Sequence, residues 1–322
     1  MGECMKKILI LFGGNSYEHE ISSLSVNFIL ENIDKKKYDY TLVGIDKSND
    51  WYIINDYKYI DSNWKNNNIK KIDNIIDFIK QFDKVFPMIH GNSCEDGKLQ
   101  SLFELFNINY VGCNSYSSLI SYDKYLTKLV IDKYDIKQAP YIKYEDKMDL
   151  NNISYPVIVK PCKSGSSIGI NVSSNYDELV KHINLALIYD NDIIIEKYIE
   201  NRRELECAIL EKNNELIISD VGEIVVDGWY DYENKYNLKS DTIISDIDDS
   251  IKDKIKECSK KIFKVLKCKD FARIDFLYDV NYEELYFNEI NTIPGFTDIS
   301  MYPILIKNSG IKSSELINIL LS

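Results

Sequence analysis

Apolar residues in the first third of this chain form two kinds of pattern. Residues 6–12 (KKILILF) are a short apolar run that ends at two glycines, which predicts a buried strand. Residues 21–33 carry apolar side chains at helical spacing, which predicts a helix. Residues 55–83 are polar and predict a surface excursion with one helix. The remaining predicted elements are strands at 40–45, 84–89 and 109–113 and a helix at 97–106. Alternating strands and helices predict a parallel sheet, and we expect this first unit to span residues 1–113.

The rest of the chain predicts two further units. The second, residues 114–201, has a helical segment at 116–135, a strand at 156–161, a helix at 176–188 and a strand at 192–199. The third, residues 202–322, has strands at 204–210, 215–226, 271–279 and 285–293, a helix at 249–267 and closing helices. Residues 227–247 show no regular pattern, and a loop of this length is often functional.

Composition narrows the class of protein. The 322 residues suit two or three compact units, and 45% hydrophobic with 28% charged residues is typical of a globular protein. A net charge of −12 argues against binding to nucleic acid or to anionic lipid. The chain has no run of 18 uncharged apolar residues, so no membrane span is predicted. Seven scattered cysteines without a CxxC pair indicate free thiols, and we expect a reducing, cytoplasmic location.

A loop rich in glycine and serine follows one of the predicted strands. Residues 165–169 (GSSIG) expose several backbone N–H groups, which can hold phosphate oxygens. Lys160, at the end of the preceding strand, adds a positive charge suited to phosphate. No GK[ST] or GxGxxG pattern is present, so neither a Walker loop nor a dinucleotide fold is indicated. The alternative is an ordinary loop.

The last two predicted strands carry polar side chains at alternating positions. Arg273 and Asp275 share one strand face, and Glu289 and Asn291 share a face of the next strand. If these strands pair antiparallel, three oxygen donors converge, and Mg²⁺ that also holds phosphates prefers such ligands. Arg273 could then neutralise charge on a transferring phosphoryl group. The alternative is a solvated sheet face with ordinary ion pairs.

Three further segments carry candidate groups. Residues 13–20 lie between the first strand and the first helix, where Glu18 could accept an ammonium group; alternatively, a polar side chain there caps the helix. His90 likewise follows a strand, and a lone histidine is more often structural. Residues 196–199, with Glu204 beyond, offer an extended backbone and two acids that would suit a purine nucleoside.

In this order, these segments resemble the D-alanine–D-alanine ligases of the ATP-grasp superfamily. The resemblance covers nearly the whole chain through the segments FGGNSYEHEIS, HGNSCEDGKLQ, SYDK, VKPCKSGSSIG, IEKYI, YDYENKY, FARIDF and FNEINTIPGFT. It implies an α/β fold of three domains, with an N-terminal parallel-sheet (pre-ATP-grasp) domain and ATP between the other two. The implied reaction is phosphorylation of one D-alanine by ATP, followed by attack of the amine of a second D-alanine on the acylphosphate.

The resemblance also implies roles for residues that match the family's motifs. For the first D-alanine it implies Glu18, Ser166, Tyr236 and His90. For the phosphates it implies Lys124, Lys160 and Lys235, and for adenosine Glu196, Lys197, Ile199 and Glu204. For two Mg²⁺ ions, with Mn²⁺ as a substitute, it implies Asp275, Glu289 and Asn291. For the tetrahedral oxyanion it implies Arg273 and Gly295, and for the second substrate Ser300 with Asp298 nearby. It further implies a lid formed by the 227–247 loop, and a homodimer.

The chain departs from the family pattern at two places. The turn at residues 200–203 is one residue longer and lacks the usual glycine, which bears on the ribose contact of Glu204. Asp298 stands where the family has serine, in the region where relatives that accept D-serine or D-lactate vary. Two alternatives therefore remain open: a D-alanine–D-serine ligase of the vancomycin-resistance type, and a non-catalytic nucleotide-binding relative.

Overall fold

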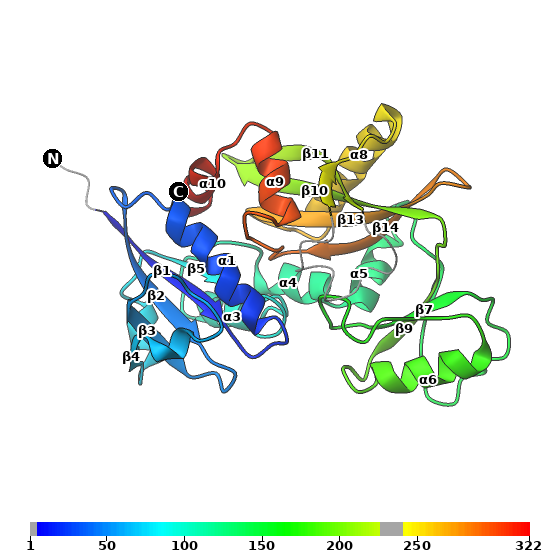
Figure 1. The fold of residues 1–322 in the computed structure, drawn as a ribbon, viewed down its shortest axis with the longest axis horizontal. Helices are drawn as coiled ribbons and strands as arrows, with labels where there is room; N and C mark the ends of the chain where they lie inside the picture. Colours follow the sequence, from blue (N-terminus) through cyan, green and yellow to red (C-terminus); the bar gives the residue numbers. More distant parts are fainter. Residues whose placement is uncertain (1–4, 226–240) are drawn as a thin grey trace.

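The first of three sheets is built around parallel strands. The computed structural model describes residues 5–225 and 241–322, and Figure 1 shows their arrangement. In the first sheet the strand order is β4-β3-β2-β1-β5. Its strands are β1 (Lys6–Gly13), β2 (Tyr38–Ile45), β3 (Trp51–Asp56), β4 (Asn68–Lys71) and β5 (Lys84–Met88). Its helices are α1 (His19–Asn32), α2 (Ile75–Ile79) and α3 (Lys98–Leu105), with a 3-10 turn at Trp64–Asn66.

The predicted parallel sheet is confirmed for β1, β2 and β5 but not for the edge of the sheet. Strands β3 and β4 pair antiparallel beside β2; β4 lies within the polar segment 55–83, for which a surface excursion was predicted, and β3 was not predicted. The strand predicted at 109–113 is wrong, because only Tyr110 forms an isolated bridge, to Val85. A polar segment that buries little apolar surface can still pair as an edge strand of a sheet, and hydrophobic periodicity does not detect such a strand.

The second sheet is small and antiparallel, with strand order β6-β9-β7-β8. Its strands are β6 (Tyr141–Lys143), β7 (Val157–Pro161), β8 (Asn171–Ser173) and β9 (Ile193–Lys197). Helix α6 (Tyr176–Ala186) covers one face of this sheet, below β7 and β9 in Figure 1. Asn175 caps this helix by accepting a hydrogen bond from the backbone N–H of Glu178, and Leu179 and Ile183 pack on the strands.

The single helical segment predicted at 116–135 is two helices, α4 (Ser115–Tyr122) and α5 (Lys124–Ile131). Asp123 separates them in an extended conformation. Its carboxylate accepts hydrogen bonds from the backbone N–H groups of Tyr125 and Leu126, at 3.0 and 3.1 Å. An aspartate that caps in this way ends one helix and begins the next. The break places Lys124 at the first position of α5.

The third sheet is antiparallel, with strand order β12-β11-β10-β13-β14. Its strands are β10 (Arg202–Lys212), β11 (Glu215–Val225), β12 (Asp241–Ile244), β13 (Phe271–Asp279) and β14 (Glu284–Asn291). Strand β12 occupies the end of the loop predicted at 227–247. The helices are α8 (Asp249–Val265), α9 (Met301–Asn308) and α10 (Ser313–Leu321).

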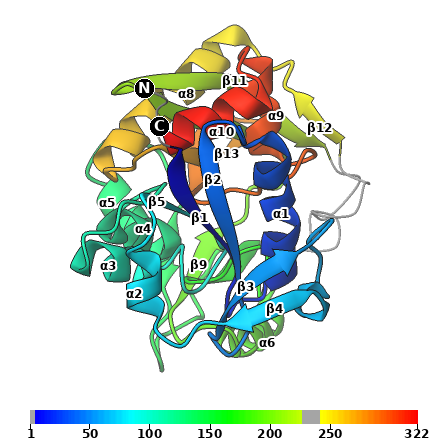
Figure 2. The ribbon, with the colours of Figure 1, turned by 90° about the vertical axis from the view of Figure 1, so that its left-hand side faces the viewer.

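Alternation along β10 assigns the two faces of this sheet. Leu205 and Cys207 pack in the apolar cluster beneath α8, whereas Ala208 packs in a second cluster with α9. That second cluster continues through α10 into the first sheet, and both views place α10 against α1 (Figures 1 and 2). Because residues two apart share a face, Glu204 and Glu206 lie on the side of the sheet that Ala208 occupies. No helix in the described ranges is both long and apolar enough to cross a membrane.

Candidate active site

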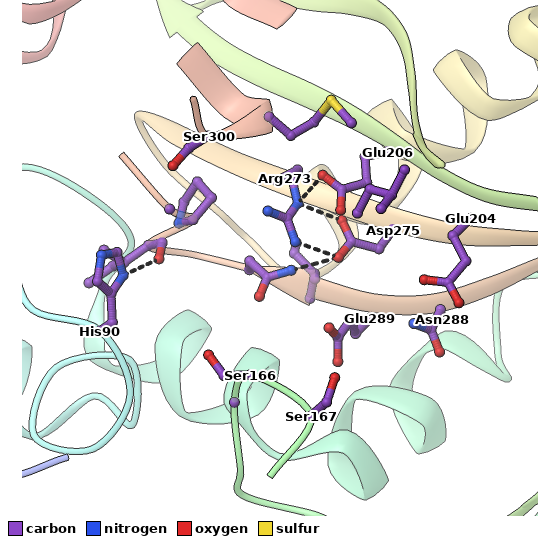
Figure 3. A pocket seen from close by; sticks show the side chains of 18 of the residues that line it. His90, Ser166, Ser167, Glu204, Glu206, Arg273, Asp275, Asn288, Glu289 and Ser300 are labelled. Atoms are coloured by element: carbon purple, nitrogen blue, oxygen red, sulfur yellow. Dashed lines mark hydrogen bonds and ion pairs between the residues drawn. The ribbon is translucent and has the colours of Figure 1, made fainter. Parts of the chain in front are cut away.

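A cleft of about 450 Å³ opens where the three sheets meet. It is lined by β13 and β14, by the loop after β7, by the segment after β5, and by the turn before α9. Figure 3 shows polar side chains pointing into it from each of these elements. The lining includes thirteen of the sixteen predicted site residues that the structure describes: Glu18, His90, Lys124, Lys160, Ser166, Glu204, Arg273, Asp275, Glu289, Asn291, Gly295, Asp298 and Ser300.

The predicted antiparallel pairing of the last two strands is confirmed. Asp275 lies opposite Glu289, and Arg273 lies opposite Asn291. Arg273 donates two hydrogen bonds to the Asp275 carboxylate, from Nε at 2.8 Å and from a terminal nitrogen at 2.7 Å. The amide of Asn291 donates to the same carboxylate at 3.0 Å. One arginine and a group of oxygen donors are thus held together on the cleft side of the sheet.

These donors fit a magnesium ion in their chemistry. Asp275, Glu289 and Asn291 offer only carboxylate and amide oxygens, the ligands that Mg²⁺ prefers when it also contacts phosphates. The set contains two carboxylates and one amide. Accordingly, among the residues that the structure describes, no group of three or more His, Cys, Asp or Glu side chains forms a metal site.

Glu206 and Asn288 are among the polar residues of the cleft that the sequence analysis missed. Glu206 lies opposite Asp275 on β10, and its carboxylate is 2.8 Å from Nε of Arg273. The register between β13 and β14 shifts after Asp275, which gives β14 a bulge at Asn288. Because of this bulge, Asn288 faces the cleft beside Glu289. The alternation of Glu204 and Glu206 could have revealed the first residue. Nothing in the sequence indicates the bulge, and regular alternation would turn Asn288 away.

The glycine- and serine-rich loop has an unusual backbone conformation. Ser166 and Ser167 have φ values of 51° and 59°, in the left-handed region that residues other than glycine seldom adopt. Backbone strain of this kind concentrates at functional sites. The loop touches the first unit, since the Ser166 hydroxyl donates a hydrogen bond to Glu18. A Cβ on Gly165 would lie 2.5 Å from the same Glu18 carboxylate, so a larger residue there would displace that carboxylate.

Lys124 and Lys160 bring positive charge to the cleft from two elements. The ammonium group of Lys124 donates to the carbonyl of Ser164 at 2.6 Å and lies 3.5 Å from the Glu289 carboxylate. The ammonium group of Lys160 donates to Glu196 at 2.9 Å and to Asn288 at 3.1 Å. Both lysines therefore lie between the glycine- and serine-rich loop and strand β14.

Glu196 is held between two lysines. Its second oxygen is 3.2 Å from the ammonium group of Lys128, which is almost completely buried and was not predicted as a site residue. Burial would raise the pKa of Glu196, but Lys128 and Lys160 outweigh burial and lower it. Of the remaining predicted nucleoside residues, Lys197 is exposed at the end of β9, and Ile199 packs against Ala139 and Tyr286.

His90 connects the first unit to the third. Its Nδ1 is 2.9 Å from the carbonyl oxygen of Ile293, and its Nε2 is 2.9 Å from the hydroxyl of Ser25. A carbonyl only accepts, so Nδ1 carries the proton and Ser25 donates to Nε2. Burial lowers the pKa of His90 and favours this neutral form. Nearby, burial and the Glu18 carboxylate raise the pKa of Glu95 well above its usual value.

The far wall of the cleft is the turn that enters α9. The Ser300 hydroxyl accepts a hydrogen bond from the backbone N–H of Thr297 at 3.0 Å. A Cβ on Gly295 would lie 3.0 Å from this hydroxyl. Asp298, Ser300 and Met301 line the cleft here. Lys235 and Tyr236, which the sequence analysis placed in the lid, lie outside the described residues.

The fold and this cleft define an ATP-grasp enzyme. Residues 7–113 match the family description "D-ala D-ala ligase N-terminus", and residues 130–322 match "D-ala D-ala ligase C-terminus". The chain therefore belongs to the D-alanine–D-alanine ligase family and is an ATP-dependent ligase.

Individual relatives agree with this assignment. A D-alanine–D-alanine ligase of Caldicellulosiruptor bescii is 40% identical over 98% of this chain and 94% of the relative. The structure of the VanG D-Ala:D-Ser ligase from Enterococcus faecalis is 34% identical with a TM-score of 0.88, covering 99% of both chains. A Bacillus anthracis D-alanine–D-alanine ligase complexed with ATP is 25% identical with a TM-score of 0.77, covering 98% of this chain and 96% of that chain.

Proposed function

We propose that this enzyme joins two D-alanines to D-alanyl-D-alanine, using Mg-ATP and a D-alanyl phosphate intermediate, for peptidoglycan precursor synthesis. The observation that supports this most strongly is the cleft itself. It brings the Arg273–Asp275 pair, the Glu289 carboxylate, two lysines and the Ser166–Glu18 contact together from three separate units. Each group has a use in forming and then attacking an acylphosphate.

In the first step, a carboxylate oxygen of one D-alanine attacks the γ-phosphorus of ATP. A new O–P bond forms, the bond to the β-phosphate oxygen breaks, and ADP leaves. Glu18 accepts the ammonium group of this D-alanine, and Lys124 and Lys160 contact the phosphates as point charges. Asp275, Glu289 and Asn291 would hold Mg²⁺, two ions in our proposal, which neutralises charge on the phosphate oxygens.

In the second step, the neutral amine of another D-alanine attacks the acyl carbon of D-alanyl phosphate. The tetrahedral intermediate carries a negative oxygen, which Arg273 and the backbone N–H of Gly295 stabilise. Collapse of the intermediate breaks the C–O bond, releases phosphate and leaves a peptide bond once the amine loses its proton. Ser300 receives the carboxylate of this second substrate.

One comparison favours a second candidate acceptor. The VanG relative is a D-Ala:D-Ser ligase. In this chain, Asp298 lines the cleft beside Ser300, so an extra acid faces the second-substrate region. A carboxylate there could accept a hydrogen bond from a D-serine hydroxyl. The second candidate is therefore D-alanyl-D-serine formation by the same steps.

A competition assay tests both candidates. Purified enzyme is incubated with Mg-ATP and equimolar D-alanine, D-serine, D-lactate and L-alanine, and the products are identified by mass spectrometry. Mainly D-alanyl-D-alanine supports the first proposal. Mainly D-alanyl-D-serine replaces it with the second, and Asp298→Ser should then shift the product toward D-alanyl-D-alanine. No condensation product, with ATP and magnesium present, contradicts both proposals.

We further propose that the enzyme is a homodimer, as the resemblance implies, and that it is cytoplasmic, as its scattered cysteines indicate. Light scattering coupled to size-exclusion chromatography measures the mass in solution. A monomer at assay concentration would contradict the homodimer without affecting the proposed chemistry.

A further inference from the structure

Arg202 lies at the end of the cleft opposite His90, where the chain enters β10. Its side chain is 15% exposed and lines the cleft together with Glu204, which Figure 3 shows far from His90. It is one of only three arginines in the chain, and the sequence analysis gave it no role. Its neighbour Arg203 does not line the cleft.

Within the described part of the chain, Glu204, Ile199 and Tyr198 contact the guanidinium of Arg202. Two of its nitrogens contact Oε1 of Glu204, Nε at 3.0 Å and a terminal nitrogen at 2.9 Å. The other terminal nitrogen donates to the carbonyl of Ile199 at 3.1 Å. The ring of Tyr198 lies beneath the guanidinium, with its centroid 4.7 Å from the central carbon. Arginine can make these contacts together because its donors are arranged in a rigid plane.

These contacts leave part of Glu204 available for a ligand. Both nitrogens of Arg202 contact Oε1, and Oε2 has no hydrogen-bond partner among residues 5–225 and 241–322. An unrestrained glutamate samples several rotamers and loses that freedom when it binds a ligand. Arg202 removes this freedom in advance, because it fixes the carboxylate that faces the cleft.

Arg202 also fixes part of the segment 196–199, which together with Glu204 would suit a purine nucleoside. Its bond to the Ile199 carbonyl ties down the segment that directly follows β9, the strand that carries Glu196 and Lys197. One side chain thus fixes the distance between this segment and the Glu204 carboxylate. A nucleoside could then bind with its base against the segment after β9 and its sugar at the Glu204 carboxylate, and both of these groups are held by Arg202.

We propose that Arg202 is a positioning residue for nucleoside recognition, which holds Glu204 so that its carboxylate accepts the ribose hydroxyls of ATP. This inference rests on the proposed function, in which the enzyme uses ATP, and on the ribose contact that the resemblance implies for Glu204. It adds a residue that sets how strongly the enzyme distinguishes ATP from an analogue that lacks a ribose hydroxyl.

Steady-state kinetics with ATP and with 2′-deoxy-ATP and 3′-deoxy-ATP test this role. Replacing Arg202 by methionine keeps much of the stem and removes the planar donors. We expect the KM for ATP to rise about tenfold, the effect of weakening one hydrogen bond to a charged group. The KM for D-alanine and kcat should stay near the wild-type values. The preference for ATP over at least one deoxy analogue should fall by a similar factor.

Arg203→Met is the matched control. Arg203 is the adjacent residue and has ion pairs of its own, with Glu223 and Asp246, away from the cleft. Its replacement should leave the preference for ATP over both deoxy analogues as in the wild type, even if stability changes. Loss of that preference in Arg203→Met, equal to the loss in Arg202→Met, would show a general disturbance of β10 and overturn the proposal.

Two further variants separate the possible failures. Arg202→Lys keeps the charge without the planar donors and should lose part of the preference for ATP; it carries the test if Arg202→Met does not fold. An unchanged preference in both Arg202 variants overturns the proposal. If Glu204→Gln loses the preference while the Arg202 variants keep it, only the role of Arg202 fails. If Glu204→Gln also keeps it, the ribose contact that the resemblance implies for Glu204 fails as well.

Discussion

At the scale of single residues, the charged groups of the cleft are held by one another. Arg273 lies between the carboxylates of Asp275 and Glu206, at 2.7 and 2.8 Å. Lys160 is held by Glu196 and Asn288. Groups fixed in this way need little reorganisation when charge develops on a substrate, and such preorganised electrostatic stabilisation is usually the largest contribution to catalysis.

Replacing Arg273 by alanine tests its proposed role at the oxyanion. We expect the rate of dipeptide formation to fall on the order of 100-fold or more, because a preorganised donor to the developing charge is lost. The rate is measured as phosphate released at saturating ATP and D-alanine. Arg273→Lys, which keeps the charge but only one point of contact, should lie between alanine and the wild type. Turnover near the wild-type rate in Arg273→Ala would remove the oxyanion role.

At the scale of elements, a tight hairpin sets the register of β10 and β11. Lys212 lies opposite Glu215, and Asn213 and Asn214 form a two-residue turn with φ values of 54° and 64°. Two left-handed residues make the turn whose twist matches paired strands, and asparagine tolerates this conformation better than most residues do. The turn thereby sets the pairing of residues 209–212 with residues 215–218, up to the register shift beyond Ile209.

Replacing Asn214 by valine should therefore destabilise the protein. A β-branched residue in the left-handed region costs about 1–2 kcal/mol, so the free energy of unfolding should fall by about that amount. Urea unfolding followed by circular dichroism measures the change. Asn214→Gly is the matched control and should cost nothing, because glycine adopts this conformation freely. Equal stability of the valine and glycine variants would show that the turn does not constrain the hairpin.

At the scale of the whole molecule, single contacts join the three units around the cleft. His90 joins the first unit to the third, and Ser166 joins the second to the first through Glu18. Lys160 joins the second to the third through Asn288. A continuous apolar cluster beneath the first sheet, α9 and α10 supports these contacts. The cleft is therefore formed only when all three units are in place.

The junction at His90 should make stability depend on pH. Burial lowers the pKa of His90 below the ordinary histidine value of about 6.5, so the unfolded chain takes up this proton first as the pH falls. The stabilisation from neutral His90 is thus complete above about pH 6.5 and is lost as the pH falls below this value.

Urea unfolding at a series of pH values measures this effect. Between about pH 7.5 and about pH 5.5, the wild type should lose more free energy of unfolding than His90→Gln, which has no proton to gain. Glu95 has a raised pKa and contributes in the opposite direction, but it does so in both proteins. If the difference in free energy of unfolding between the wild type and His90→Gln does not change with pH, this account of the junction is contradicted.

Local periodicity predicted much of the fold and of the candidate site. The buried strands β1, β5 and β7 could be read from apolar runs, and α1 from helical spacing. It also showed that Arg273 and Asp275 share a strand face, because alternation along one strand needs no knowledge of its neighbours. The motif resemblance added the order of the three units and the implied roles of the site residues.

Only the tertiary structure decided which of these faces and segments meet. Glu206 comes to Arg273 because β10 pairs with β13, and a sequence does not state which strands are neighbours. Asn288 faces the cleft because β14 carries a bulge. The sequence by itself determined the side-chain chemistry and the strand faces, since these follow from local backbone geometry. Long-range pairing and packing decided the contacts that assemble the cleft, because they depend on segments far apart in the chain.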